Sequence, residues 1–215
     1  MPDRNAPTQT DPAALLGQID IYLLDQVLRG RIRPGMSLLD VGCAGGRNIE
    51  YFLRAGYDVT GVDPDPGAVE RVRALAAEIA PHLPPGRFHL GSVETLAVLE
   101  RSFDVVVCIA VLHFAQDEAQ FQAMLDGLWG AVLPGGMFLA RLASSIGLED
   151  RIRPLDQAGG SRRFLLPDGT ERFLVDEQQL LEATTRLGGT LLDPLKTTNV
   201  QNLRCMTTWV VRKGC

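Results

Sequence analysis

Short, almost uninterrupted apolar runs separated by helical patterns constrain the fold of this chain more than any other feature. The run Phe103–Ile109 contains three consecutive valines and follows a polar segment. A strand that is apolar on both faces is typical of a parallel sheet covered by helices on each side. Further strands are expected at Ser37–Val41, Asp58–Val62, Arg87–Leu90 and Met137–Arg141. Their alternation with helices predicts an α/β fold with a doubly wound, mostly parallel sheet.

Helical spacing and turn residues predict the remaining elements. Helices are expected at Ala13–Leu28, Asn48–Ala55, Pro66–Ala80, Glu118–Val132 and Asp176–Leu187. A hairpin is expected around the turn Pro167–Thr170, followed by strands Thr190–Val200 and Arg204–Arg212, whose short connection makes them antiparallel. We predict a single domain over residues 1–215, with residues 1–35 as a helical lid and residues 144–173 as a long insertion over the active site.

Composition argues against several classes of function. The chain has 215 residues, 46% of them hydrophobic, and a formal net charge of −5. It lacks the basic character of nucleic-acid binders, so we expect a small-molecule partner. No apolar run reaches the roughly 18 residues that span a bilayer, and no signal peptide is evident. The four cysteines have no metal-ligand or disulfide spacing. We therefore expect a cytoplasmic protein with no bound metal and no membrane partner, in an oligomeric state left open, a homodimer included.

The segment Leu38–Asn48 carries the strongest functional signal. It leads from a strand through the glycine-rich turn Gly42–Gly46 into a helix. Such a turn lets backbone approach a ligand closely, and the helix N-terminus offers free N–H groups to a carboxylate. Asp40, at the end of the strand, suits an ammonium group. The segment predicts a site for an amino-acid zwitterion, although a tight strand-to-helix turn with no ligand has the same residues.

A second acidic residue extends this site. Asp63 ends the next apolar strand, where an acid can accept hydrogen bonds from ribose hydroxyls. The alternative role is to cap the following helix, which Asp65 can do equally well. The glycines do not have the Gly-x-Gly-x-x-Gly spacing of a dinucleotide site, and no Walker lysine follows them. A nicotinamide-dependent oxidoreductase is therefore the weaker alternative.

Together these residues resemble the class I S-adenosylmethionine-dependent methyltransferases. The resemblance covers Asp40-x-Gly42-x-Ala44-x-Gly46, Asp63, Gly91–Glu94, Phe103–Phe114 and Leu133–Gly136. Within that family, Gly46–Asn48 and Tyr51–Val59 are similar to the tellurite-resistance type and its small-molecule relatives. The resemblance implies a Rossmann-like, seven-stranded sheet with an antiparallel last strand. It also implies S-adenosylmethionine as methyl donor and S-adenosylhomocysteine as product.

The resemblance further implies roles for individual residues. The donor's methionine part would be held by the loop and its flanks: Asp40, Gly42, Cys43, Ala44, Gly45, Gly46 and Asn48. Asp63 would bind the ribose, and Pro64 would pack on the adenine. Ser92 and Val93 would face the adenine edge, and the backbone at Cys108 or Ile109 would line the methionine amine. Two positions depart from the family: Ala44 replaces a usual glycine, and Ser92 stands where an acid is common.

Candidate acceptor-binding residues follow the fourth and fifth strands. His113 can act as a base or orient the acceptor, or it can simply pack at the start of a loop. Arg141 ends the fifth strand, and Arg162 and Arg163 lie in the insertion. These arginines can bind an anionic acceptor through forked hydrogen bonds, or belong to a solvated loop. The prediction is methyl transfer to a small molecule at an undetermined atom; a non-catalytic S-adenosylmethionine-binding module is the remaining alternative.

Overall fold

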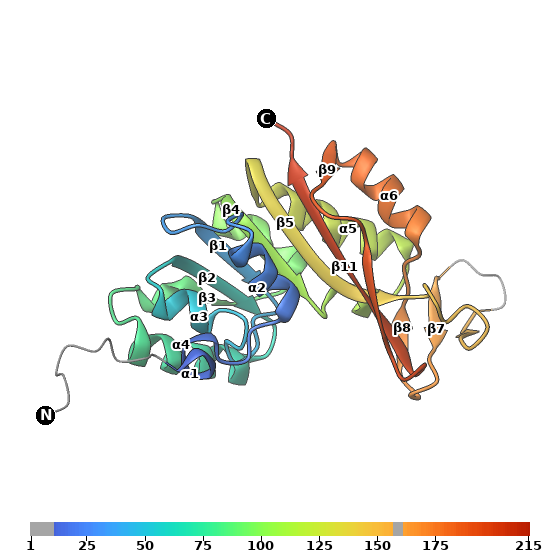
Figure 1. Cartoon of the computed structure of the whole chain (residues 1–215), viewed down its shortest axis with the longest axis horizontal. Helices are drawn as coiled ribbons and strands as arrows, with labels where there is room; N and C mark the ends of the chain where they lie inside the picture. Colours follow the sequence, from blue (N-terminus) through green and yellow to red (C-terminus); the bar gives the residue numbers. More distant parts are fainter. Residues whose placement is uncertain (1–10, 157–160) are drawn as a thin grey trace, which may run out of the picture.

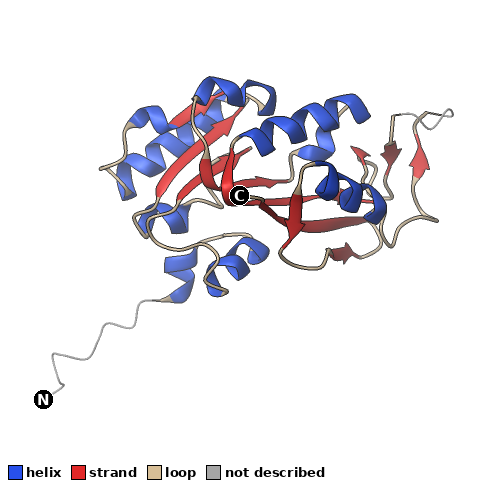
Figure 2. Ribbon diagram, turned by 90° about the horizontal axis from the view of Figure 1, so that it is seen from above, coloured by secondary structure: helices blue, strands red, loops and turns tan. Residues whose placement is uncertain are grey.

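A long twisted sheet forms the centre of the computed structural model, which describes residues 11–156 and 161–215 (Figures 1 and 2). Its strands are β1 (Ser37–Val41), β2 (Asp58–Asp63), β3 (Phe88–Leu90), β4 (Phe103–Ile109), β5 (Val132–Ser144), β9 (Gly189–Leu191), β10 (Lys196–Val200) and β11 (Arg204–Lys213). The strand order is β10-β11-β5-β4-β1-β2-β3, and β9 pairs separately with β11. Strands β1 to β5 run parallel to one another, whereas β11 is antiparallel to β5, β9 and β10.

The predicted fold class is confirmed, with one correction to the number of strands. The sheet has eight strands rather than seven, because the stretch predicted as one strand over Thr190–Val200 forms both β9 and β10. Pro194 has no backbone N–H to donate to a neighbouring strand. Its neighbour Asp193 leaves the sheet and forms an ion pair with Arg31 at 2.6 Å. The strand therefore breaks there and resumes at Lys196.

Helices cover both faces of the sheet. The α-helices are α1 (Pro12–Leu16), α2 (Ile21–Leu28), α3 (Glu50–Arg54), α4 (Pro66–Ile79), α5 (Glu118–Gly130) and α6 (Glu177–Arg186). The short 3₁₀ turns are η1 (Pro85–Arg87), η2 (Val93–Leu99) and η3 (Leu112–Phe114). The single helix expected over Ala13–Leu28 is wrong. Gly17 has a left-handed φ of 57°, which ends α1, and the side chain of Asp20 caps a new helix by accepting from Tyr22 N–H.

Alternate residues of the central strands form two separate cores. Leu38 and Val105 face α2, α3 and α4, whereas Leu39 and Val106 face η2, α5 and α6. All four side chains are fully buried. The two-residue period of a strand sends neighbours to opposite faces, so a strand apolar at every position needs a helical layer on each side.

The N-terminal segment and the insertion, the two predicted additions to the core, both contain regular elements. From residue 11 onward the N-terminal segment contains α1 and α2, and residues 1–10 lie outside the described part. Residues 144–173 include a small antiparallel sheet of β6 (Arg153–Pro154), β7 (Arg163–Leu165) and β8 (Glu171–Phe173), with residues 157–160 not described. In Figure 1 this sheet lies at the far end of β5 and β11. No helix in the described ranges is long and apolar enough to cross a membrane.

The strand order creates a crevice at one edge of the sheet. β1 lies between β2 and β4, so the chain leaves β1 toward β2 on one side and later returns to β4 on the other. Connections that diverge in this way leave a gap outside the carboxyl ends of the strands, where open α/β sheets bind their ligands.

Candidate functional site

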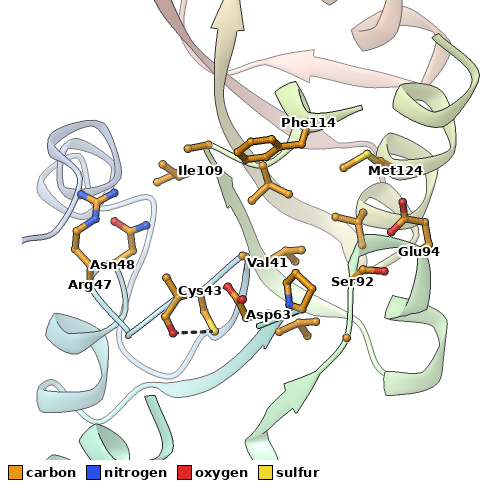
Figure 3. A pocket seen from close by; sticks show the side chains of 18 of the residues that line it. Val41, Cys43, Arg47, Asn48, Asp63, Ser92, Glu94, Ile109, Phe114 and Met124 are labelled. Atoms are coloured by element: carbon orange, nitrogen blue, oxygen red, sulfur yellow. Dashed lines mark hydrogen bonds between the residues drawn. The ribbon is translucent and has the colours of Figure 1, made fainter. Parts of the chain in front are cut away.

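A cavity of about 560 Å³ lies at the carboxyl ends of β1, β2 and β4. Its walls come from the loop after β1, the end of β2, the turn before η2, the segment after β4, and α5. In Figure 3, Cys43, Arg47 and Asn48 lie on one side, and Ser92, Glu94 and Met124 on the other. One cavity thus brings together segments that the sequence analysis singled out separately.

The glycine loop after β1 is shaped by close contacts. Gly42 N–H donates to the carbonyl of Val62 at 2.8 Å, with a φ of 78°. A Cβ atom on Gly42 would lie 2.2 Å from the side chain of Val111, and one on Gly46, whose φ is 93°, would lie 2.7 Å from Leu75. No side chain fits at either position without moving its neighbours, so both glycines are required by this loop.

Ala44 adopts the conformation that a glycine would accept more easily. Its φ of 47° is left-handed, and its side chain is exposed. An alanine in this region costs roughly 1–2 kcal/mol. The methyl group therefore fits the loop sterically, and the cost is conformational.

Asp63 links the end of β2 to the glycine loop. Its carboxylate accepts from Ala44 N–H at 2.8 Å and from Asp65 N–H at 2.9 Å. These two bonds hold both oxygens at the cavity wall and leave lone pairs for further donors, such as hydroxyl groups. Asp65, not Asp63, caps α4 by accepting from Gly67 N–H. The capping alternative considered for Asp63 therefore belongs to Asp65.

Asp40 is fully buried, and neither carboxylate oxygen has a hydrogen-bond partner among the described residues. Burial raises its pKa to about 7; Arg47 opposes this effect, and Asp63 adds to it. A buried, unpaired carboxyl group is costly unless a cation or donor satisfies it. Asp40 does not itself line the cavity, but the next residues of the chain, Val41 and Gly42, do.

The far end of the cavity contains an acidic residue that the sequence analysis did not select. Pro64, Ser92 and Val93 line the cavity as the resemblance implied, and Glu94 lines it beside them. Hydrogen bonds from Ser92 and then from Gln120 lower the pKa of Glu94. Position 92, where an acid is common in the family, is a serine, and an acid lines the cavity two residues later. Glu94 lies within the segment Gly91–Glu94 that carried the family resemblance, and this position in the sequence could have identified it.

The structure brings most, but not all, of the predicted donor-site residues to the cavity wall. Those that line it are Gly42, Cys43, Ala44, Asn48, Asp63, Pro64, Ser92, Val93 and Ile109. Gly45, Gly46 and the fully buried Cys108 are not part of the lining. Wall residues that the sequence analysis missed include Arg47, Val111, Phe114 and Met124. Apolar residues such as Phe114 have no pattern that distinguishes a cavity wall from the core.

A second cavity of about 380 Å³ adjoins the first one. Both are lined by Arg47, Ile109, Ala110 and Phe114. The second also includes residues of η3, β5, the β7–β8 turn, β8 and the region around the β10–β11 turn: His113, Arg141, Ala143, Leu166, Asp168, Thr170, Arg172, Val200, Arg204 and Met206. Part of the insertion therefore lines a cavity next to the donor site.

His113 is a buried, neutral member of this second wall. Burial, followed by the nearby Arg172 and Arg204, lowers its pKa to about 4. Its Nδ1 accepts from Ala143 N–H at 3.2 Å. A neutral imidazole that accepts at Nδ1 carries its proton at Nε2. In this state the ring can donate a hydrogen bond but has no free nitrogen to take a proton.

The three arginines predicted to bind the acceptor have different positions. Arg141 lines the second cavity and forms an ion pair with the buried Asp20 at 3.0 Å. Arg162 pairs with Asp176, and Arg163 bonds to Gln116 and to Glu171. Neither Arg162 nor Arg163 is part of either cavity wall.

The arrangement fits the donor implied by the sequence. The orphaned carboxylate of Asp40 is suited to a nearby ammonium group, and Asp63 to ribose hydroxyls. The glycine loop leaves room for close backbone contact with a carboxylate. The wall formed by Pro64, Val93 and Met124 is apolar enough for a flat base.

Comparison with known proteins gives a consistent picture. A model of the "Methyltransferase domain" family matches residues 39–140. The mitochondrial ubiquinone biosynthesis O-methyltransferase of Schizosaccharomyces pombe is 32% identical over 196 residues, covering 85% of this chain and 68% of that protein. Several bacterial relatives, at 32–35% identity, are covered over only 40–49% of their length.

Solved structures share the fold at lower identity. A 1,6-didemethyltoxoflavin-N1-methyltransferase from Burkholderia thailandensis, with bound 1,6-didemethyltoxoflavin and S-adenosylhomocysteine, has a TM-score of 0.66 and 21% identity. The match covers 95% of this chain and 80% of that one. TehB from Haemophilus influenzae has a TM-score of 0.65 and 20% identity, with 91% and 62% covered.

Proposed function

This chain belongs to the class I S-adenosylmethionine-dependent methyltransferases, and from that premise we propose that it methylates a small molecule held in the second cavity. One observation carries the proposal. Asp63 and the glycine loop, each singled out in the sequence as a donor contact, are joined by the 2.8 Å bond from Ala44 N–H at a single cavity.

The donor supplies a methyl group bonded to a positively charged sulfur. An acceptor atom can attack the methyl carbon directly and displace the sulfur, which leaves as a neutral thioether. Such a reaction depends mainly on alignment and on exclusion of water. We assign the first cavity to the donor, with Asp63 accepting from the ribose and Asp40 compensating the ammonium charge. Ile109, Ala110 and Phe114 belong to both cavities and would separate or align the two substrates.

His113 enters this proposal as a hydrogen-bond donor rather than as a base. Its Nδ1 is already occupied by Ala143 N–H, so its Nε2–H is the free group. It can orient an oxygen of the acceptor but cannot remove a proton from it in this state. Any proton that the acceptor loses would pass to solvent or to another group.

The small-molecule acceptor is supported by the size of the second cavity and by the relatives. The relatives are named for ubiquinone biosynthesis and for 1,6-didemethyltoxoflavin, both small-molecule chemistries. The acidic composition supports an acceptor other than nucleic acid. Three buried free cysteines are consistent with a reducing, cytoplasmic location.

Calorimetric binding of S-adenosylhomocysteine tests the donor site. We expect Asp63→Ala to weaken binding about ten- to a hundredfold, because charged hydrogen bonds contribute about 1.5–3 kcal/mol. The matched control is Asp65→Ala, which removes the α4 cap and should lower stability but leave affinity nearly unchanged. No binding by folded wild-type protein would refute the proposal. Binding without turnover of any acceptor would favour the non-catalytic alternative.

A further inference from the structure

The second cavity has an uneven balance of charge. Four arginines line it, from four separate parts of the chain: Arg47, Arg141, Arg172 and Arg204. Asp168 is the one carboxylate among the lining residues, and His113 is held neutral. Arg141 is compensated by Asp20. The remaining wall therefore has a clear excess of positive charge.

Two of these guanidinium groups lack a carboxylate partner within the described residues. Arg47 donates to the backbone carbonyl of Gln18, and Arg172 to that of its neighbour Glu171. Arg204 has only a long contact of 3.8 Å to Asp168, with more than half of its side chain exposed. These cations can thus bind an anion without first breaking a strong ion pair.

Arg172 is also held in a fixed orientation. Its guanidinium lies 4.9 Å from the centre of the Phe114 ring, and Phe114 lines both cavities. Stacking on an aromatic ring restrains the group, while its in-plane N–H donors stay available for a carboxylate. A restrained donor loses less entropy when it binds a ligand.

His113 adds a donor without charge. The residue is 6% exposed, and Nε2 has no partner among the described residues. With Nδ1 taken by Ala143 N–H, the free N–H lies in the same wall as Arg172 and Arg204. Because Nε2 is not among the buried atoms that lack a partner, this N–H is accessible from the cavity and can donate to an acceptor oxygen there.

We propose that the second cavity selects methyl acceptors that carry a carboxylate beside an apolar body. Arg172 and Arg204 bind the carboxylate, and His113 donates to one of the acceptor's oxygens. The apolar body packs against Ile109, Phe114 and Met206. This inference rests on the proposed function, because it assumes that the adjoining cavity holds the methyl donor.

Matched pairs of probes test the inference. Benzoate and benzamide, and phenylacetate and phenylacetamide, differ in charge at nearly constant shape. Each is titrated by calorimetry into protein saturated with S-adenosylhomocysteine. We expect each carboxylate to bind about ten- to a hundredfold more tightly than its amide, as is typical of hydrogen bonds between charged groups.

Variants then locate the effect. Arg172→Gln and Arg204→Gln should each reduce the preference for the carboxylate about five- to twentyfold, whereas Asp168→Asn should increase it. Arg212→Gln is the matched control, because Arg212 is an exposed residue of the same strand as Arg204 but lies at its other end. It should leave the preference unchanged.

The outcomes separate this inference from the proposed function. Failure of S-adenosylhomocysteine to bind wild-type protein would contradict the proposed function. If it binds but the carboxylates bind no better than the amides, or no probe binds, the inference is wrong and the proposed function stands. Tighter binding of phenyl phosphate than of benzoate would overturn the assignment to carboxylates.

Discussion

At the residue scale, Asp40 couples binding to stability. A carboxyl group whose pKa rises on folding, here from 3.8 to about 7, holds its proton more tightly in the folded chain. The folded state therefore loses stability as pH rises from about 4 to about 7. Under the proposed function, this cost is the expected consequence of keeping an unpaired acid near the donor's ammonium group.

Asp40→Asn tests this coupling. We expect the variant to be more stable than wild type at pH 8 by roughly 1–4 kcal/mol and nearly equal at pH 4, because the amide does not ionise. Urea unfolding at both pH values measures the difference. The same variant should bind S-adenosylhomocysteine more weakly at pH 8. A stability difference that does not vary with pH would contradict this account.

Ala44 departs from the family in residue type, and its left-handed φ of 47° is one that glycine adopts more easily. Ala44→Gly should stabilise the chain by up to about 1 kcal/mol, because relief of the left-handed strain exceeds the entropy lost by glycine. The control Ala55→Gly places glycine at an ordinary φ of −82° on an exposed site, where we expect a loss of about 0.5–1 kcal/mol. Denaturant unfolding should show a higher free energy of unfolding for Ala44→Gly and a lower one for Ala55→Gly. Equal losses of stability in both variants would show that Ala44 is unstrained.

At the element scale, Asp20 is a main link between the N-terminal helices and the site. Asp20 caps α2, pairs with Arg141 of β5, and its backbone N–H donates to Asn48 of the loop region at 3.2 Å. Tyr22 of α2 bonds to Thr198 of β10 at 2.7 Å. These contacts hold α2 against the carboxyl edge of the sheet. The lid role of this segment stays a prediction, because α1 and α2 line neither cavity.

Asp20→Asn measures the strength of this connection. The amide can still cap α2, but it leaves Arg141 without its carboxylate, which should cost roughly 1–3 kcal/mol. Asp126→Asn is the control, because its pair with Arg186 is about half exposed and should contribute less than about 1 kcal/mol. Urea unfolding compares the two. Faster proteolysis near Gly17 in Asp20→Asn alone would locate the effect in the N-terminal segment.

At the scale of the whole molecule, two cores on opposite faces of one sheet hold the cavity walls together. The donor cavity is lined by Val93 and Met124, which belong to one core, and by Cys43 and Ile109, which belong to the other. A ligand there therefore contacts residues of both cores. Ligand binding to the folded state alone should stabilise the entire domain by mass action.

Thermal unfolding tests this expectation and also tests whether a nicotinamide cofactor binds instead. S-adenosylhomocysteine at about 100 times its Kd should contribute about 2.7 kcal/mol, which raises the Tm by roughly 5–10 °C for a domain of this size. NADH at the same concentration should leave the Tm unchanged. A shift with NADH alone would support the oxidoreductase alternative and contradict the donor assignment.

Much of the fold could be predicted because its signals are local. The apolar run Phe103–Ile109, the glycines after β1 and the acid at position 63 are patterns within a few residues, and each predicted its strand or turn. The helix break at Gly17 was missed because apolar residues on both sides continue the helical spacing across it. The division of β9 and β10 was missed for a similar reason, since strand-forming residues flank Pro194 on both sides.

The sequence by itself determined the α/β class and predicted which segment binds the donor, because strand burial and close backbone approach each require particular residues in a short stretch. Only the tertiary structure decided which arginines line the second cavity. Arg163 and Arg172 lie on neighbouring strands, yet Arg172 pairs across from Phe164 rather than from Arg163. Neighbouring positions of a strand face opposite ways, so a one-residue difference in register decides whether a side chain lines the cavity.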